Sequence, residues 1–207
     1  MREETIELRR LEDLCSHERL LQQVGVTPVA GVDEAGMGPL AGPVVAAAVI
    51  MPVDALIDGL DDSKALRRQE RERLDEEIRR RAIAVGVAAV DVADIDSLNI
   101  YHAGLRAMHL AVANLGIPPR HLLVDARTIP GLGIPQMAFV KGDARVYSIA
   151  AASVIAKVHR DRIMTELDER YPGYGFARHC GYATAEHRDA LRRLGPCPVH
   201  RRSFTLV

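Results

Sequence analysis

The chain has 207 residues, of which 48% are hydrophobic and 27% are charged, and its formal net charge is −1. This composition is typical of a folded globular protein, and its apolar runs, such as Val44–Met51, are far shorter than the ~20 residues of a membrane-spanning helix. The charged first residues do not resemble a signal peptide, and the three cysteines lack a C-x-x-C pair, which argues against a disulfide framework or a thiolate zinc site. We therefore expect a cytoplasmic protein.

The small net charge hides an asymmetry along the chain. Residues 141–207 contain 12 Lys and Arg against 7 Asp and Glu, whereas residues 1–140 contain 15 against 21. A basic C-terminal third beside an acidic body indicates a local face for anions such as nucleic acid. Arginine-rich helices that are simply solvated explain the same pattern equally well.

The first part of the chain predicts one helix and a set of strands. Hydrophobic periodicity predicts an amphipathic helix over residues 3–23. Val29–Asp33 and Pro43–Ile50 predict two strands, and the intervening turn signal Gly36-Met37-Gly38-Pro39 makes them a hairpin. A helix over 67–81 and a third strand over 82–90 follow.

The second part alternates helices and strands. A helix over 98–115 precedes a short apolar strand, His121–Asp125, which we expect to be parallel to its neighbour. The remaining predicted elements are a strand over 137–140 and helices over 147–167 and 184–194. The pattern predicts one α/β domain over 1–207: an N-terminal helix (1–24), a mixed-sheet core flanked by helices (25–145) and a basic, helical C-terminal appendage (146–207).

Acidic residues stand at the ends of three predicted strands. Asp33 and Glu34 follow the first, Asp125 ends another, and Asp143 comes just after a third. Neighbouring strands are ~5 Å apart, so acids at their ends would repel each other unless a cation lies between them. Oxygen ligands without His or Cys favour Mg²⁺ or Mn²⁺. Any one of these acids alone is also explained as a helix cap or a turn residue.

Two glycines beside the acids have no side chains that would shield the main chain. Gly36 and Gly38 allow a ligand to approach backbone N–H groups, although a hairpin turn alone also explains them. The segment is neither a P-loop nor a dinucleotide fingerprint. Further along, Ser63 is expected to cap the following helix or to meet a ligand, and Lys64 could reach an anionic one.

Several segments together resemble the ribonuclease HII family. They are GVDEAGMGPLAGPVVAAAVI (residues 31–50), DDSKAL, LLVDA, VKGDARVYSIAAASVIAKVHRDRIM, YPGYGFARHCGYATAEH and HRRSF, in the family's order from about Val29 to Phe204. The resemblance implies a ribonuclease H-like fold with a five-stranded mixed sheet. It also implies an endonuclease that cuts the RNA strand of RNA–DNA hybrids and incises 5′ of ribonucleotides embedded in duplex DNA, leaving 5′-phosphate and 3′-OH ends.

The resemblance also assigns roles to residues. It implies that Asp33, Glu34, Asp125 and Asp143 bind two Mg²⁺ or Mn²⁺ ions and catalyse hydrolysis. It places Gly36-Met37-Gly38 on a motif whose backbone contacts the ribose 2′-OH, and Tyr182 on a substrate-sensing tyrosine. Candidate phosphate contacts are Lys64, Lys157, Arg160 and the arginines after residue 178.

Three positions depart from the family pattern. Met37 replaces the usual arginine, Ala126 replaces a glycine and Cys180 replaces a lysine. These changes affect the expected affinity and ribonucleotide selectivity more than the chemistry, because all four acids are present. Two alternatives stay open: a hybrid-binding module that has lost catalysis, and a metal-dependent phosphatase for small molecules. No motif for a protein partner is evident, so a monomer is expected.

Overall fold

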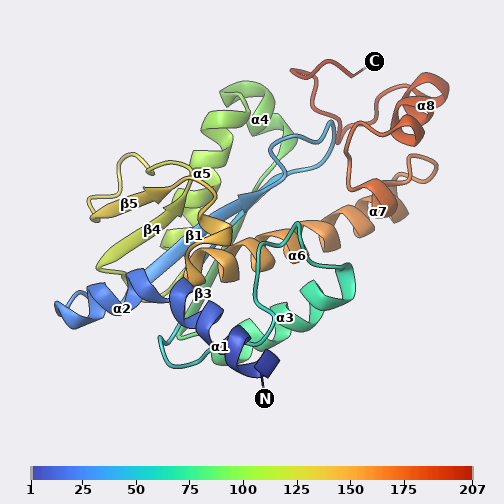
Figure 1. Cartoon of the computed structure of the whole chain (residues 1–207). Helices are drawn as coiled ribbons and strands as arrows, with labels where there is room; N and C mark the ends of the chain where they lie inside the picture. Colours follow the sequence, from blue (N-terminus) through green and yellow to red (C-terminus); the bar gives the residue numbers. More distant parts are fainter. Residues whose placement is uncertain (1, 207) are drawn as a thin grey trace.

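The computed structural model describes residues 2–206, with side chains from residue 4, and centres on a five-stranded sheet in the order β3-β2-β1-β4-β5 (Figure 1). Antiparallel pairing joins the first three strands, β1 (Val29–Ala35), β2 (Val44–Ile50) and β3 (Ala84–Val90). Parallel pairing adds β4 (His121–Asp125) to β1 and β5 (Gln136–Phe139) to β4. The predicted hairpin, the parallel β4 and the mixed sheet are confirmed.

Alternation along β2 explains why helices cover both faces of the sheet. All seven residues of β2 are buried. Ala47 and Val49 join the cluster under α6 (Tyr147–Arg170), whereas Ala46 and Ala48 join the cluster under α5 (Ile100–Ala113). Because neighbouring side chains of a strand point to opposite faces, a continuous apolar strand must be covered on both sides.

The long helix α6 lies directly against β1. A Cβ atom on Gly31 would lie 2.1 Å from the carbonyl carbon of Ser148, so only glycine permits this approach. The buried small residues Ala150, Ala151 and Ala152 continue the close contact along the helix. The small residues at the start of this helix thereby allow α6 to lie beside the strand that carries Asp33 and Glu34.

The C-terminal elements extend beyond the sheet, around the far end of α6 (Figure 1). Helices α7 (Phe176–His179) and α8 (Ala185–Leu194) pack with Met164 of α6 in a separate apolar cluster that includes Leu40 and Ala41. An isolated bridge pairs Ala41 with His200. The turn between β1 and β2 is therefore built into the C-terminal part of the molecule.

Two of the predicted helices are in fact divided. The helix expected over 3–23 is α1 (Arg2–Leu14) and α2 (Ser16–Gln23), and its buried stripe is Leu11, Leu14, Cys15 and Glu18. Ile6, Leu8 and Leu20 are exposed, so not all apolar residues of this helix pair lie on its buried side.

The helix expected over 98–115 is preceded by an unpredicted helix, α4 (Val92–Leu98). Asn99, at φ 67°, separates it from α5 and caps α5 by accepting the N–H of His102. Sequence analysis also missed α7 and the 3₁₀ turn Gly142–Ala144, since runs of three or four residues carry too little periodicity to detect.

The remaining helix, α3 (Arg68–Arg81), starts later than Ser63 would require. The expectation that Ser63 caps this helix is wrong. The N–H of Arg67 is bound instead by the Glu70 carboxylate, at 2.8 Å. Within the described residues, the structure contains no helix long and apolar enough to cross a membrane.

Candidate active site

The acidic residues expected at strand ends come together near the C-terminal ends of β1 and β4, although Asp33 and Glu34 lie within β1, which extends to Ala35, and do not follow it. Val32 of β1 lies opposite Val124 of β4, so Asp33 and Asp125 occupy the next position on two adjacent parallel strands. Asp143 lies in the 3₁₀ turn after β5, and the N–H of Gly142 in that turn donates to Asp125 Oδ1 at 2.7 Å. The parallel pairing that the helix before β4 imposes is therefore what joins carboxylates far apart in sequence.

Burial and mutual repulsion make these carboxylates costly to ionise. Asp33 is 4% exposed, and its pKa is raised well above the usual value, first by burial and then by the charges of Glu34 and Asp125. Burial also raises the pKa of Glu34 and of Asp125, and Asp143 contributes repulsion to both. The strand pairing and the bond from Gly142 to Asp125 place these carboxyl groups near one another, which is why their charges repel.

Two cations partly offset this negative charge. Lys64 Nζ lies 3.1 Å from Asp143 Oδ2, and Arg127 Nη2 lies 3.5 Å from Glu34 Oε1. Ser63, next to Lys64, is buried, and its hydroxyl is 2.7 Å from that of Ser153 on α6. The Ser63–Ser153 contact therefore fixes the loop that carries Lys64 over the acids.

The donor chemistry of the site fits divalent metal ions. Its ligands would be the carboxylate oxygens of Asp33, Glu34, Asp125 and Asp143, the type that Mg²⁺ and Mn²⁺ prefer. Glu34 Oε2 is buried and has no hydrogen-bond partner. Among the described residues, no group of three or more Asp, Glu, His or Cys side chains is already arranged to hold an ion. In this arrangement, Lys64 and Arg127 engage two of the carboxylates.

The glycine turn lies beside Tyr182. A Cβ atom on Gly38 would contact only Tyr182 Cε1, at 3.8 Å, and Tyr182 is 45% exposed. Gly36, in contrast, has φ +100° and a Cβ atom there would lie 2.2 Å from Arg160 Nε. Packing and backbone conformation explain the glycine at position 36, whereas neither explains the one at position 38.

Comparison with known proteins adds the decisive observation. The family model described as ribonuclease HII matches residues 30–207.

The chain belongs to the ribonuclease HII family.

Relatives named ribonuclease HII are similar over nearly the whole chain. The protein from Geobacillus kaustophilus is 58% identical over 96% of this chain and 76% of its own length. The protein from Anaeromyxobacter sp. is 57% identical over 96% of this chain and 63% of its own length. Ribonuclease HII is a hydrolase that acts on RNA in RNA–DNA hybrids, so this chain is an enzyme of that class.

Solved structures confirm the ribonuclease H-like fold. Ribonuclease H2 from Pyrococcus horikoshii superposes with a TM-score of 0.72 at 28% identity, covering 86% of this chain and 94% of that chain. The ribonuclease HII from Archaeoglobus fulgidus, solved in a complex with PCNA, gives a TM-score of 0.73 at 28% identity, covering 87% and 96%. The expected fold class and family resemblance are therefore confirmed.

Two of the cations expected to contact phosphate are not available for that role. Arg160 is 1% exposed and donates to the backbone carbonyls of Ala41, Pro43 and Cys180. Arg201, one of the arginines after residue 178, is 0% exposed and also binds carbonyls. The prediction that these two side chains meet phosphate is wrong, because a sequence position does not reveal whether an arginine points inward.

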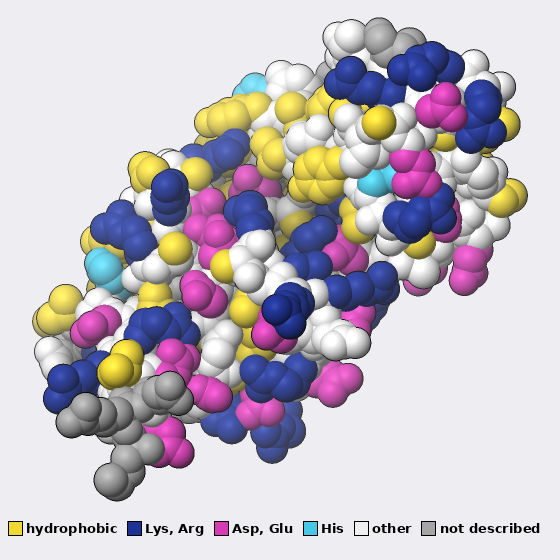
Figure 2. All heavy atoms as spheres, turned by 45° about the vertical axis from the view of Figure 1, so that its right-hand side comes forward, with side chains coloured by type: hydrophobic (Ala, Val, Ile, Leu, Met, Phe, Trp, Pro, Cys, Tyr) yellow, Lys and Arg dark blue, Asp and Glu magenta, His cyan; other side chains and the backbone are white. Residues whose placement is uncertain are grey.

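The other arginines of the C-terminal part remain at the surface. Figure 2 shows several Lys and Arg side chains on the lobe at its upper right, which the C-terminal elements form, interspersed with acidic ones. Arg178 is paired with Glu186 there, and Arg193 with Asp189 at 3.0 Å. The positive charge of the C-terminal part is therefore partly paired within α8 and its surroundings.

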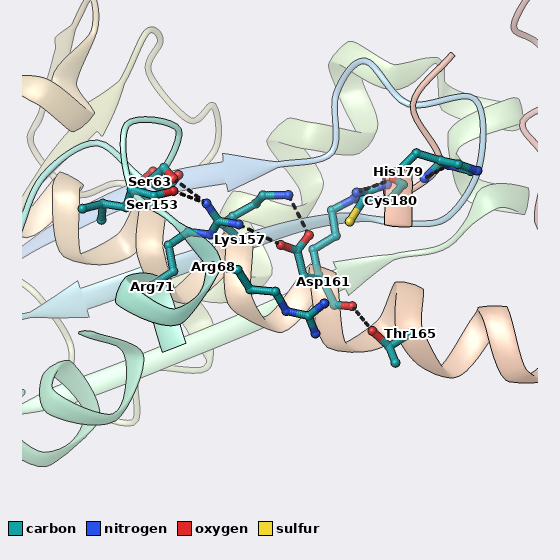
Figure 3. A network of polar contacts seen from close by, with 12 residues as sticks. Ser63, Arg68, Arg71, Ser153, Lys157, Asp161, Thr165, His179 and Cys180 are labelled. Atoms are coloured by element: carbon teal, nitrogen blue, oxygen red, sulfur yellow. Dashed lines mark hydrogen bonds and ion pairs between the residues drawn. The ribbon is translucent and has the colours of Figure 1, made fainter. Parts of the chain in front are cut away.

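A polar network links α3, α6 and the segment that carries Tyr182. Figure 3 shows Lys157 and Arg71 directed at Asp161, with Nζ–Oδ1 and Nη2–Oδ2 distances of 2.6 and 3.6 Å. Burial and then the Asp161 carboxylate raise the pKa of the Cys180 thiol, whereas the charge of Lys157 lowers it. Lys157 thus supplies positive charge near the position where the family usually has lysine.

Sequence analysis missed Arg127 as a residue of the site. It contacts Glu34 and lies over the ring of Tyr101, 5.0 Å from the ring centre. Its position two residues after Asp125 was the only signal in the sequence. The left-handed conformation of the intervening Ala126, at φ 59°, helps to bring the chain around the acids.

Proposed function

We propose that this enzyme hydrolyses phosphodiester bonds with two divalent metal ions held by Asp33, Glu34, Asp125 and Asp143. We further propose that it incises 5′ of single ribonucleotides in duplex DNA as well as cutting RNA–DNA hybrids, leaving 5′-phosphate and 3′-OH ends. The observation that carries this proposal is the gathering of buried, mutually repelling carboxylates at the end of β1 and β4, with Glu34 Oε2 unpartnered.

The carboxylates have distinct parts in this chemistry. Asp33 and Asp125, on adjacent strands, are best placed to share the two ions, Glu34 to complete the shell of one, and Asp143 to hold the second or to orient water. When bound, the ions would lower the pKa of the attacking water and stabilise the leaving 3′ oxygen. Lys64 is the better placed of the two cations to move from the acids to substrate phosphate, because its side chain is 77% exposed, whereas Arg127 is also held over the ring of Tyr101.

Recognition of the ribose is proposed for the glycine turn and Tyr182. The missing side chain at Gly38 leaves space that the protein itself does not fill, directly beside the half-exposed ring of Tyr182. A sugar can approach the backbone there while the ring lies against the neighbouring deoxyribose.

The unpaired cysteines at positions 15, 180 and 197 agree with the reducing cytoplasm that we propose as the location.

Substitution of single acids tests the catalytic proposal. Asp33→Asn and Asp125→Asn should each abolish cleavage, in Mg²⁺ or Mn²⁺, of a duplex with one ribonucleotide and of a continuous hybrid, while far-UV circular dichroism stays unchanged. Asp13→Asn, at an exposed position on α1, is the matched control and should cut normally. Near-normal cleavage by either site variant would contradict the assignment. Loss of cleavage in all three would point to a general effect of charge.

Mapping of the products separates the two substrate classes. The wild-type enzyme should cut 5′ of the single ribonucleotide and at many positions of the continuous RNA strand. A protein that binds hybrids without cutting them in Mn²⁺ would instead be the binding module considered above. Preferential hydrolysis of small phosphomonoesters would identify a phosphatase.

Gly38→Ala tests recognition separately from chemistry. The added methyl group meets only the Tyr182 ring at van der Waals distance, and Gly38 lies outside the left-handed region, so the variant should fold normally. It should bind the ribonucleotide-containing duplex at least about tenfold more weakly, since one close hydrogen bond is lost. Binding of an all-DNA duplex of the same sequence should not change. Equal affinities of wild type and variant for both duplexes would exclude close backbone approach at this position.

A further inference from the structure

Two arginines are fully buried in this molecule without an acidic partner. Arg160 is 1% exposed and Arg201 is 0% exposed, and among the described residues neither forms an ion pair with Asp or Glu. Burial lowers the pKa of both guanidinium groups, and the charge of Arg160 further lowers that of Arg201, to about 9. Burying two like charges side by side is unfavourable unless their donors are satisfied, so the groups that they bind define their role.

The donors of Arg201 converge on the glycine turn. Its Nη2 donates to the carbonyl of Gly36 at 2.6 Å and its Nη1 to the carbonyl of Met37 at 3.2 Å. Further bonds hold the carbonyls of Gly42 and Pro43, at 2.9 to 3.2 Å. One planar guanidinium therefore gathers the carbonyls from both ends of the turn.

These bonds determine where the N–H groups of the turn point. The carbonyl of Gly36 and the N–H of Met37 belong to one trans peptide unit, in which the two groups point in opposite directions. The same holds for the carbonyl of Met37 and the N–H of Gly38. Because Arg201 draws both carbonyls inward, the two N–H groups point away from it. Among the described residues, neither N–H donates a hydrogen bond.

Arg160 supports the same turn from the side. Its Nε lies against Gly36 and donates to the carbonyl of Pro43 at 3.0 Å. Its Nη1 donates to the carbonyl of Cys180, also at 3.0 Å, which ties the turn to the segment that carries Tyr182. The turn and the tyrosine are thus held in a fixed relation by one side chain of α6.

We propose that Arg201, supported by Arg160, is a positioning residue for substrate: it fixes the Gly36–Met37 and Met37–Gly38 peptide units so that the N–H groups of Met37 and Gly38 are presented to the hydroxyl oxygen of a ribose. This role rests on the proposed function of the glycine turn. It explains why the guanidinium groups are retained in an apolar setting, where they bind only main chain.

A purely structural role, in which Arg201 only holds the fold together, does not explain its contacts with the glycine turn. The later part of the turn is already anchored by backbone bonds, from Leu40 N–H to the carbonyl of Gly181 at 2.8 Å and from Gly42 N–H to that of Val199 at 2.9 Å. The two peptide units between Gly36 and Gly38 have no such anchor. Arg201 is therefore the group that sets their orientation.

A binding experiment in a cleavage-deficient background tests this role. Duplexes with and without one ribonucleotide, otherwise identical in sequence, are titrated with Asp33→Asn and with the double variants that add Arg201→Met or Arg201→Lys. The Asp33→Asn protein should prefer the ribonucleotide duplex. Adding Arg201→Met should reduce this preference about tenfold or more, whereas adding Arg201→Lys should reduce it less. The affinity for the all-DNA duplex should stay the same in both. Arg162→Met, an exposed position on α6, is the matched control for loss of an arginine and should keep the preference.

The outcomes separate recognition of the ribonucleotide by the glycine turn from the positioning role of Arg201. If the Asp33→Asn protein itself shows no preference, ribonucleotide recognition by the turn is wrong. If it shows the preference and both Arg201 variants keep it in full, only the positioning role of Arg201 is wrong. If Arg201→Met does not fold, Arg201→Lys carries the same comparison, because it keeps the charge while losing the planar fork.

Amide spectroscopy gives a readout that does not depend on metal or cleavage. In ¹⁵N-labelled wild-type protein, the amides of Met37 and Gly38 should exchange rapidly with water when free and shift on addition of the ribonucleotide duplex. Arg201→Lys should move these amide signals while leaving those of the distant Gly116 and Gly131 in place. Slow exchange of both amides in the free protein would overturn the proposal, because it would show that they are bonded internally.

Discussion

Ala126 shows how a single residue next to the acids carries a conformational cost. It adopts φ 59°, in the left-handed region, directly after Asp125, and its N–H donates to the carbonyl of Phe139 at 2.8 Å. The position is one where the family usually has glycine, and the structure gives the reason: only glycine adopts this conformation without strain. The alanine keeps the path of the chain at the expense of stability.

Ala126→Gly should therefore stabilise the protein. Relief of left-handed strain should raise the free energy of unfolding by about 1 kcal/mol, measured by urea denaturation followed by circular dichroism. Ala113→Gly, the same change at the helical end of α5, is the control and should lower it by about 0.5–1 kcal/mol. A loss of stability in both variants would show that Ala126 is not strained.

Met37 stands where the family resemblance implies an arginine, so a positive charge is absent at this position. Its sulfur lies 3.0 Å from the position that a Cβ atom on Gly104 would occupy, so the side chain packs against α5. Met37→Arg places a cation that cannot pack there and must turn toward solvent and substrate. The plot of log affinity against log salt concentration should steepen by roughly 0.9 for each phosphate contacted, with tighter binding at low salt. An unchanged salt slope would show that the side chain at position 37 does not meet phosphate.

At the scale of elements, α8 and the C-terminal segment contribute two histidines, His187 and His200, to a hydrogen-bonded chain that ends on the carbonyl of Tyr182. The carbonyl of Tyr182 needs a proton on His187 Nδ1, so a neutral His187 accepts at Nε2 from the Nε2–H of His200, 3.0 Å away, and His200 Nδ1 then accepts the N–H of Cys197 at 2.9 Å. His187 Nδ1 in turn donates to the carbonyl of Tyr182 at 2.9 Å. This order of donors works only while both rings are neutral.

The histidine chain predicts acid sensitivity of the C-terminal elements. Burial lowers the pKa of His200 to about 4 in the folded protein, whereas the unfolded chain takes up the proton near pH 6.5. Between these values the unfolded state binds more protons, so stability falls as the pH is lowered from about 6.5 to about 4, by about 1–3 kcal/mol. Urea unfolding at pH 7.5 and pH 5 should show a smaller difference in His200→Gln than in wild type. His102→Gln, an exposed control, should match the wild type.

At the scale of the whole molecule, the fold brings together charges that weaken it. Asp33 is buried beside Glu34 and Asp125, and repulsion together with burial raises its pKa. A carboxyl group whose pKa is raised in the folded state releases its proton more readily when unfolded. Stability of the metal-free protein therefore falls as the pH rises from the ordinary value toward the raised one. Ions bound between the carboxylates would remove this cost.

Asp33→Asn should consequently lose activity and gain stability. Without metal at pH 7 the variant should melt at a higher temperature than wild type, because a buried, repelling charge is gone. Added Mn²⁺ should raise the melting temperature of the wild type and have little effect on the variant. A metal-free variant less stable than wild type, or one stabilised equally by Mn²⁺, would contradict the proposed site.

The sequence alone determined most of the architecture and the identity of the acids. Short apolar runs bounded by turn signals were enough for the five strands, and helical patterns were enough for α3, α6 and α8, which are longer. The helix before β4 predicted its parallel pairing, and with it the meeting of Asp33 and Asp125. The segments that resemble the family are readable from the sequence alone.

Tertiary structure alone decided the direction of individual side chains. Arg160 and Arg201 look like solvent-exposed arginines in the sequence but are buried on main-chain carbonyls, and Ser63 faces Ser153 instead of capping a helix. Arg127 joins Glu34 only because a left-handed residue turns the chain after β4. Such contacts join residues as many as 165 positions apart, so no local pattern in the sequence encodes them, and only the packed fold brings them within bonding distance.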